Sequence, residues 1–247
     1  QLEEHEDFLI RPLDVTDGEN RLALISEIEK IWGSGIDILV NNAGITYRSV
    51  LEHMAAEEED MQINTNYLAP FALIRLVLPY MRSKKSGKII NLSSVGGMMA
   101  MPTMGSYSAS KFALEGASEA LWYELQPWNI SVTLVQPGFI NSNAFREVRL
   151  SKKAIASLRE KTDYWHYYQA MESFIERFMM RAFATSDSVA AVIEKTMAQK
   201  SPPMRVPATA DAYFFSLLRR LLPRALYHKL LYRNLPDIEL WGYPDEN

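Results

Sequence analysis

Tyr107 and Lys111 are the two residues whose types and spacing most directly suggest chemistry. They lie four apart at the start of a predicted helix, so both side chains can contact one ligand. A free tyrosine, with a pKa of about 10, is too weak an acid or base at neutral pH. A nearby lysine ammonium and the positive nicotinamide of an oxidised cofactor would favour the phenolate and lower that pKa. Ser94 lies upstream, just past a predicted strand, where its hydroxyl could hold a carbonyl or alcohol oxygen.

A second tyrosine–lysine pair with the same spacing is formed by Tyr80 and Lys84. Such a short pattern also arises by chance. This pair lies at the end of a helix, in the polar turn 81–87, and no serine at a strand end precedes it. We therefore expect chemistry at Tyr107 and none at Tyr80.

The chain around these residues alternates between short apolar runs and helical patterns. The predicted strands are 8–13, 36–40, 88–92 and 130–135. The predicted helices are 22–32, 57–81 and 107–125, and helical patterns dominate from 145 to 199. This alternation predicts a doubly wound, Rossmann-like α/β domain with a parallel sheet, whose ligands bind beyond the carboxyl ends of the strands. The small and polar segments 41–44, 93–97 and 137–143 fall at those ends.

Composition excludes several other classes of protein. The 247 residues are 48% apolar and 23% charged, which is typical of one globular domain with a sizeable core. Zero cysteines and four scattered histidines argue against thiol catalysis and a metal site. A net charge of −4 gives no pull toward nucleic acid, and the apolar stretch 67–81 is interrupted by Arg75 and too short to span a membrane. We expect a cytoplasmic protein, with or without membrane association.

Four motifs together resemble the short-chain dehydrogenase/reductase family in their order and spacing. They are Asn41–Gly44, Ser94–Gly97, Tyr107–Gly116 and Pro137–Ser142. The similarity covers residues 8 to 145, and the amino-acid sequences of the second and third motifs look most like the 17β-hydroxysteroid and retinol dehydrogenase branch. The resemblance implies an NAD(P)-dependent oxidoreductase that interconverts an alcohol and a carbonyl.

The resemblance also implies a role for each candidate catalytic residue. Tyr107 would be the acid/base, Lys111 would contact the nicotinamide ribose and tune the tyrosine, and Ser94 would hold the substrate oxygen. The fourth catalytic residue matches Asn66, which would hold a water that relays protons to Lys111. Asn64 is the alternative at that position, since a buried asparagine in a helix is often only a satisfied polar group.

Further positions are implied to bind the cofactor, NAD or NADP. Asp14 and Val15 would lie beside the adenine. The adenosine ribose and the centre of the sheet would be flanked by Asn42, Ala43 and Gly44. The carboxamide would be surrounded by Pro137, Gly138, Ile140 and Ser142, where serine replaces the threonine usual in the family. Tyr107 and Lys111 would contact the nicotinamide ribose.

One departure from the family pattern is serious. The family begins with a strand, a Thr-Gly-x-x-x-Gly-x-Gly turn and a helix that receives the pyrophosphate, and Gly18, Gly33, Gly35 and Gly44 are too far apart to form that turn. We therefore expect an N-terminally truncated fragment of a longer gene product, whose activity alone is doubtful and whose NAD or NADP preference cannot be read. The alternative is a non-catalytic Rossmann-fold binding or scaffold protein without a pyrophosphate site.

The rest of the chain is interpreted as the substrate side of a single domain over 1–247, with a partial cofactor-binding and catalytic core over 1–145. Helices over 146–205 would form a substrate lid. Met98, Met99, Met101 and Met104 are either an adaptable apolar wall or core fillers. Aromatic residues of the lid, namely Tyr164, Trp165, Tyr167 and Phe174, favour a lipophilic substrate such as a steroid, retinoid or fatty carbonyl.

The C-terminal part, 206–247, contains a basic amphipathic segment and a tail. Residues 213–233 combine many leucines and aromatics with five basic residues and no acid. Two interpretations stay open: contact with a membrane interface, or a helix pair packed on the domain or on a partner subunit of a homo-oligomer. We favour packing, because Leu217 and Leu221, and Leu218 and Leu222, repeat at helical spacing.

Overall fold

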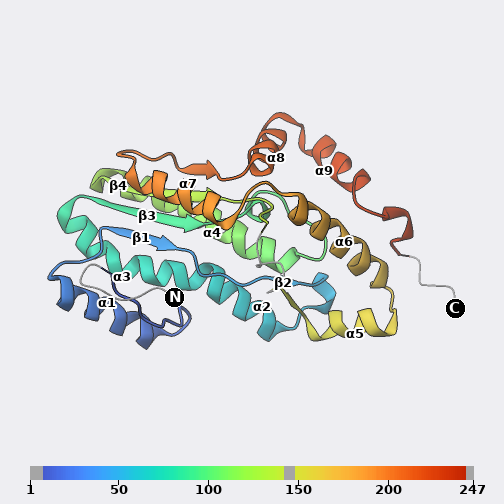
Figure 1. The fold of residues 1–247 in the computed structure, drawn as a ribbon, viewed down its shortest axis with the longest axis horizontal. Helices are drawn as coiled ribbons and strands as arrows, with labels where there is room; N and C mark the ends of the chain where they lie inside the picture. Colours follow the sequence, from blue (N-terminus) through green and yellow to red (C-terminus); the bar gives the residue numbers. More distant parts are fainter. Residues whose placement is uncertain (1–7, 142–147, 243–247) are drawn as a thin grey trace.

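A parallel four-stranded sheet lies at the centre of the computed structural model, which describes residues 8–141 and 148–242 (Figure 1). In spatial order its strands are β1 (Ile38–Asn41), β3 (Gly87–Leu92), β4 (Ile130–Gln136) and β6 (Arg205–Pro207). Asn41 pairs with Asn91, and Leu92 pairs with Val135, so the strands end at nearly the same level. A second, two-stranded parallel sheet joins β2 (Tyr47–Arg48) to β5 (Arg149–Leu150).

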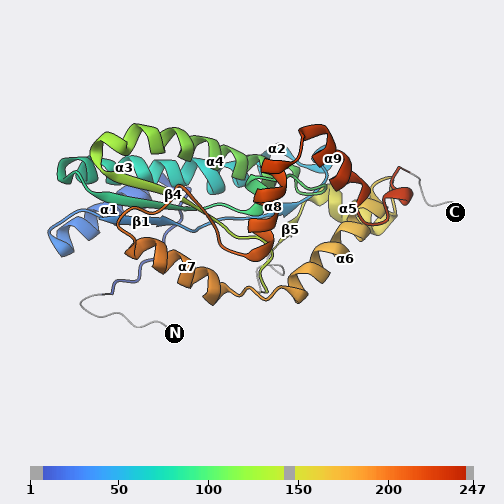
Figure 2. The same cartoon turned by 90° about the horizontal axis from the view of Figure 1, so that it is seen from above.

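Helices cover both faces of the central sheet, as Figure 2 shows. The helices on one face are α1 (Gly18–Trp32), α3 (Ala69–Lys84) and α4 (Gly105–Leu125), and the opposite face is covered by α7 (Ser186–Ala198). Side chains alternate along each strand, so Ile89 packs against the first group whereas Ile90 packs with residues of α7. The predicted doubly wound α/β fold is confirmed.

The predicted helix over 57–81 contains an irregularity. It consists of α2 (Ala56–Ile63), a π-helical turn at Asn64–Leu68, and α3. The backbone N–H of Ala69 bonds to the carbonyl oxygen of Asn64, five residues earlier. This turn buries Thr65 and Asn66, and π-helical turns of this kind are frequent at functional sites.

Two expectations differ from the structure. The apolar run 8–13 is not one of the described strands of the central sheet: Phe8 forms a single β-bridge, and residues 9–13 have no regular secondary structure. Only part of the segment 146–205 is positioned where a substrate lid would lie. Helices α5 (Lys152–Glu160) and α6 (Trp165–Arg181) lie beyond the carboxyl ends of the strands (Figure 1), whereas α7 covers the sheet and β6 extends it.

The C-terminal helices α8 (Ala210–Leu221) and α9 (Arg224–Arg233) also lie beyond those strand ends (Figure 1). One face of the pair packs on the loop after β3: Leu218 and Leu222 contact a cluster that includes Met98 and Met99. The predicted packing role is therefore confirmed for one leucine pair. For the other pair it stays a prediction, since Leu217 and Leu221 are 43% and 68% exposed on this chain and do not pack on the domain. Within the described ranges, no helix is both long and apolar enough to cross a bilayer.

Candidate active site

Ser94 and Tyr107 meet beyond the end of β3. Ser94 precedes the short turn Val95–Gly97, and its Oγ accepts the backbone N–H of Gly96 at 3.0 Å. Tyr107 lies in the first turn of α4, and its hydroxyl is hydrogen-bonded to Ser94. Gly96 makes this approach feasible, because a Cβ at that position would lie 2.8 Å from a ring carbon of Tyr107. The structure thus brings together the two hydroxyls that the sequence predicts.

Lys111 lies one helical turn after Tyr107 and is buried. Its Nζ donates to the carbonyl oxygen of Leu92 at 2.8 Å and lies 5.9 Å from the Tyr107 ring centroid. Burial lowers the pKa of Lys111 to about 8, although Glu115 opposes the shift. The pKa of Tyr107 is raised by burial, against the lowering effect of the Ser94 hydrogen bond. The lowering of the tyrosine pKa by Lys111 and the positive nicotinamide of an oxidised cofactor stays a prediction.

Asn66 is the asparagine that approaches this pair. Its Oδ1 accepts the N–H of Ile45 at 2.8 Å, and its Nδ2 donates to the carbonyl oxygen of Ile45 and to Ser110 Oγ at 2.9 and 3.0 Å. A Cβ placed on Gly44 would lie 3.3 Å from Asn66 Oδ1 and 3.8 Å from Lys111 Nζ. The amide and the ammonium thus converge on Gly44.

A cavity of about 190 Å³ opens at Ser94 and Tyr107. Its lining is mostly apolar and includes Met101, Met104, Phe139, Ile140, Ile175 and Met179. Arg48 also lines it, although it is only 4% exposed, and it forms a 3.0 Å ion pair with Glu172 of α6. Sequence reasoning missed Arg48, and its position just after the Asn41–Gly44 strand end was the signal that could have found it.

The methionine-rich loop plays both of the roles considered. Met101 and Met104 line the cavity, whereas Met98 and Met99 are buried under the C-terminal helices. The lid aromatics, by contrast, do not form the wall of this cavity: Tyr164 bonds to Glu52, Tyr167 packs against Trp241, and Phe174 lines a different cavity. The residues of α6 that line the catalytic cavity are instead Ile175 and Met179.

The loop after β4 is clamped from the start of α8. Thr209 Oγ1 accepts the N–H of Gly138 at 2.9 Å, and Asp211 Oδ2 accepts the N–H of Phe139 at 2.8 Å. On its other side the loop is tied to the Ser94 turn, since the carbonyl oxygen of Pro137 accepts the N–H of Val95 at 2.7 Å. Gly138 and Ile140 thereby face the cavity that holds Tyr107.

The other predicted cofactor residues lie farther along the strand ends. Val15, Asn42 and Ala43 share a cavity of about 230 Å³ beside β1 and α1. The carboxylate of Asp14 accepts both the N–H and the hydroxyl of Thr16, which lowers its pKa. Ser142 lies outside the described residues.

These contacts fit the nicotinamide end of a dinucleotide. Gly44 leaves space beside the Lys111 ammonium, and Gly138, Phe139 and Ile140 of the loop after β4 face the same space as Tyr107. A hydroxyl pair, a cation and a clamped loop are the groups that an oxidoreductase needs to orient a cofactor and a substrate oxygen.

Comparison with known proteins agrees with this geometry. The family model described as short chain dehydrogenase matches residues 1–153. The chain therefore belongs to the short-chain dehydrogenase/reductase family of NAD(P)-dependent oxidoreductases. Among solved structures, a short-chain dehydrogenase from Streptomyces avermitilis has a TM-score of 0.68 and 28% identity over 89% of this chain and 79% of its own. Membership of an enzyme family favours the catalytic over the scaffold interpretation.

Curated relatives include reductases. A 3-ketodihydrosphingosine reductase from Bacteroides thetaiotaomicron is 39% identical over 193 residues, which cover 77% of this chain and 70% of that protein. An NADPH-dependent 3-dehydrocapnine reductase from Ornithobacterium rhinotracheale is 28% identical, covering 91% and 80%. The chain spans only 42% of the dehydrogenase/reductase SDR family member 7B from Xenopus tropicalis, to which it is 38% identical. The hydroxysteroid and retinol branch stays a prediction.

Proposed function

We propose that this protein uses NAD or NADP to interconvert an alcohol and a carbonyl on a lipophilic substrate. The observation that carries the proposal is the hydrogen-bonded pair of Ser94 and Tyr107 at a cavity lined by methionine, phenylalanine and isoleucine side chains. Among steroid, retinoid and fatty substrates we favour the fatty type, since one relative is named a 3-ketodihydrosphingosine reductase, after a keto compound with a long hydrocarbon chain.

Each residue of the site has a distinct proposed task. The cofactor, when bound, supplies or accepts the hydride. In the reductive direction the Tyr107 hydroxyl gives its proton to the carbonyl oxygen, and Ser94 holds that oxygen by a hydrogen bond. Lys111 would hold the nicotinamide ribose, and its ammonium would return a proton to Tyr107. Asn66 holds the backbone of Ile45 beside Gly44, and with it the path by which protons reach Lys111.

Replacing Tyr107 by phenylalanine tests the assignment. We expect turnover of a long-chain ketone to fall by about 10²-fold or more, because general acid catalysis is lost while packing is kept. Consumption of NADH and of NADPH is followed by absorbance. Tyr80→Phe is the matched control, since Tyr80 has the same spacing to a lysine but lies on the solvated end of α3, and it should leave turnover unchanged. Equal losses in both variants would refute the role of Tyr107.

The exposed face of α8 and α9 is proposed to contact a membrane surface. Phe214, Leu217 and Leu221 are 57%, 43% and 68% exposed, and Arg220 and Lys229 are exposed on the same helices. Exposed apolar side chains beside cations, with no acid between 213 and 233, match an anionic lipid interface. A lipophilic substrate would be available at such an interface.

A further inference from the structure

A second cavity, of about 580 Å³, adjoins the catalytic one. Four phenylalanines, Phe139, Phe174, Phe178 and Phe183, contribute to its lining. Phe139 also lines the catalytic cavity, so the two spaces meet at this side chain. The volume lies within the range of pockets that enclose a whole small ligand, of about 300–1,000 Å³, whereas the catalytic cavity is about 190 Å³.

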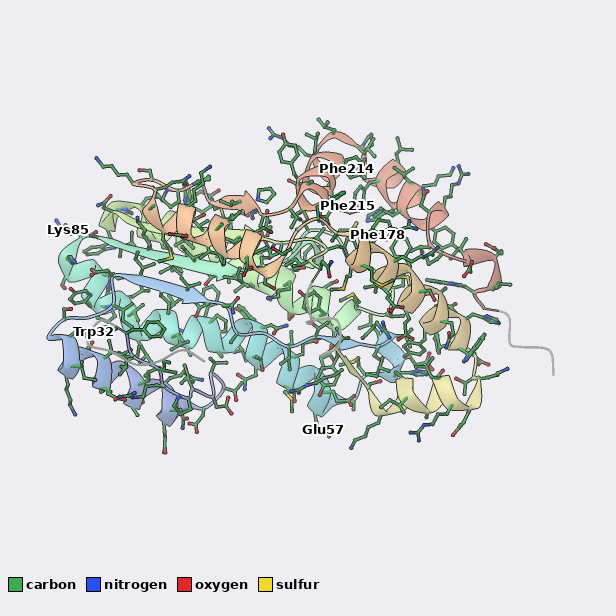
Figure 3. The ribbon with its side chains drawn as sticks, viewed as in Figure 1. Trp32, Glu57, Lys85, Phe178, Phe214 and Phe215 are labelled. Carbon is green, nitrogen blue, oxygen red and sulfur yellow. The ribbon has the colours of Figure 1, made fainter. Side chains whose placement is uncertain are left out.

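Helix α6 separates the two cavities. Ile175 and Met179 face the catalytic cavity, whereas Phe174 and Phe178 face the second one. The ring of Phe178 lies 5.2 Å from that of Phe139 and 4.6 Å from that of Phe174, measured between centroids. Figure 3 labels Phe178 on α6 and Phe214 and Phe215 on α8. An aromatic path therefore runs from the reacting hydroxyls toward the outside.

The polar groups of the second cavity are either engaged with backbone or placed at its outer rim. Thr209 and Asp211 accept the backbone N–H groups of Gly138 and Phe139. Arg177 and Arg181 lie one helical turn apart on α6 and are exposed, so their aliphatic stems can line the space while their charges stay in water. Phe183 is fully exposed, so it lies at the opening of the cavity and not in its inner wall. The remaining phenylalanines, Phe139, Phe174 and Phe178, make the inner surface suited to hydrocarbon.

We propose that the second cavity binds the hydrocarbon chain of the substrate while the carbonyl lies at Ser94 and Tyr107. This inference rests on the proposed reductase function and specifies its substrate class as long-chain ketones. The catalytic cavity is too small to hold such a chain. Among the cavities within the described residues, the second cavity is the one that shares Phe139 with the catalytic cavity. Burial of each further methylene then contributes to binding in the transition state as well as in the ground state.

A chain-length series tests the proposal. Methyl ketones from 2-butanone to 2-dodecanone are compared by kcat/KM, which should rise by about fourfold for each methylene that enters the cavity. In Ala182→Trp, which places an indole in the second cavity, the rise should disappear for the long ketones while the shortest ketones keep wild-type kcat/KM. Ala210→Trp blocks the same cavity from α8 and should act alike. Ala191→Trp, on the exposed side of α7, is the control and should keep the full rise.

The outcomes separate this inference from the proposed function. Turnover of short ketones by a blocked variant shows that it is folded and that its catalytic residues work. If wild type reduces short and long ketones equally well, or if both blocked variants keep the chain-length dependence, the second cavity does not bind the chain and the inference is overturned. If wild type reduces no ketone of any length with either cofactor, the proposed function itself fails.

Discussion

Gly138 has no room for a side chain, because the carboxylate of Asp211 occupies the place of a Cβ. A methyl group there would lie 2.5 Å from the carboxyl carbon of Asp211. Asp211 cannot retreat freely, since its Oδ2 accepts the N–H of Phe139 at 2.8 Å and the neighbouring Thr209 accepts the N–H of Gly138 at 2.9 Å. Gly138→Ala should therefore separate the loop after β4 from the start of α8.

The expected cost follows from the hydrogen bonds that are lost. A hydrogen bond to a charged group contributes about 1.5–3 kcal/mol to stability and a neutral one about 1 kcal/mol. Loss of both predicts that Gly138→Ala lowers the free energy of unfolding by about 2.5–4 kcal/mol. Gly116→Ala is the matched control: no heavy atom lies within 4 Å of its added Cβ, and alanine is favoured in the interior of α4. That variant should be more stable than wild type by up to about 1 kcal/mol.

Urea denaturation of four proteins measures the effect: wild type, Gly138→Ala, Asp211→Ala and the double variant. Removing the carboxylate removes the collision, so the double variant should cost less than the sum of the single changes, with a coupling of at least about 1 kcal/mol. Activity should fall with the loop, because Gly138 lines the catalytic cavity. Additive costs in the cycle, or a Gly138→Ala protein as stable as wild type, would show that the clamp does not hold this loop.

Two further predictions concern Lys111 and the C-terminal helices. Lys111 keeps its proton up to about pH 10.5 when unfolded but releases it near pH 8 when folded, so the unfolded state binds more protons in between and stability rises with pH. The free energy of unfolding should increase by about 1.5 kcal/mol from pH 8 to about 9.5 through this group, a gain that Lys111→Met abolishes in denaturation curves. Binding to anionic vesicles should weaken by about fivefold for each cation removed in the double variant Arg220→Gln/Lys229→Gln. The control variant Arg75→Gln/Lys195→Gln, with its changes on α3 and α7, should bind vesicles like wild type. If wild type does not bind vesicles, this face of α8 and α9 serves another contact.

The sheet and the catalytic trio could be predicted from sequence because their signals are local. β1, β3 and β4 are short apolar runs that end at small or polar residues. Ser94 lies just after such an end, and Tyr107 and Lys111 are four residues apart at the start of α4. The run 8–13 has the same pattern without becoming a strand. A strand also needs a neighbouring strand that pairs with its backbone N–H and C=O groups. The sequence of a single apolar run does not show whether such a neighbour exists.

Other parts of the site had no local signal. Ile175 and Met179 are ordinary apolar residues of a helix, and only the tertiary placement of α6 shows that they, rather than the lid aromatics, line the catalytic cavity. Asp211 is separated by 72 residues from Phe139, whose N–H it accepts. Contacts between residues so far apart in the sequence depend on how the C-terminal helices pack against the end of the sheet. The hydrophobic periodicity of the sequence does not describe that packing.

The π-helical turn at Asn64–Leu68 lets the chain add a buried site residue without disturbing the core of α3. Such a turn holds one residue more than an α-helical turn, and across it the N–H of Ala69 bonds to the carbonyl oxygen of Asn64. If one residue within the turn were deleted, the same two groups would form an ordinary α-helical hydrogen bond, so Ile74, Val77 and Met81 would keep the face that packs against the sheet. The position of Asn66 and the packing of α3 can therefore change independently, and a one-residue deletion here should remove the amide from the site while the helix keeps its place on the sheet.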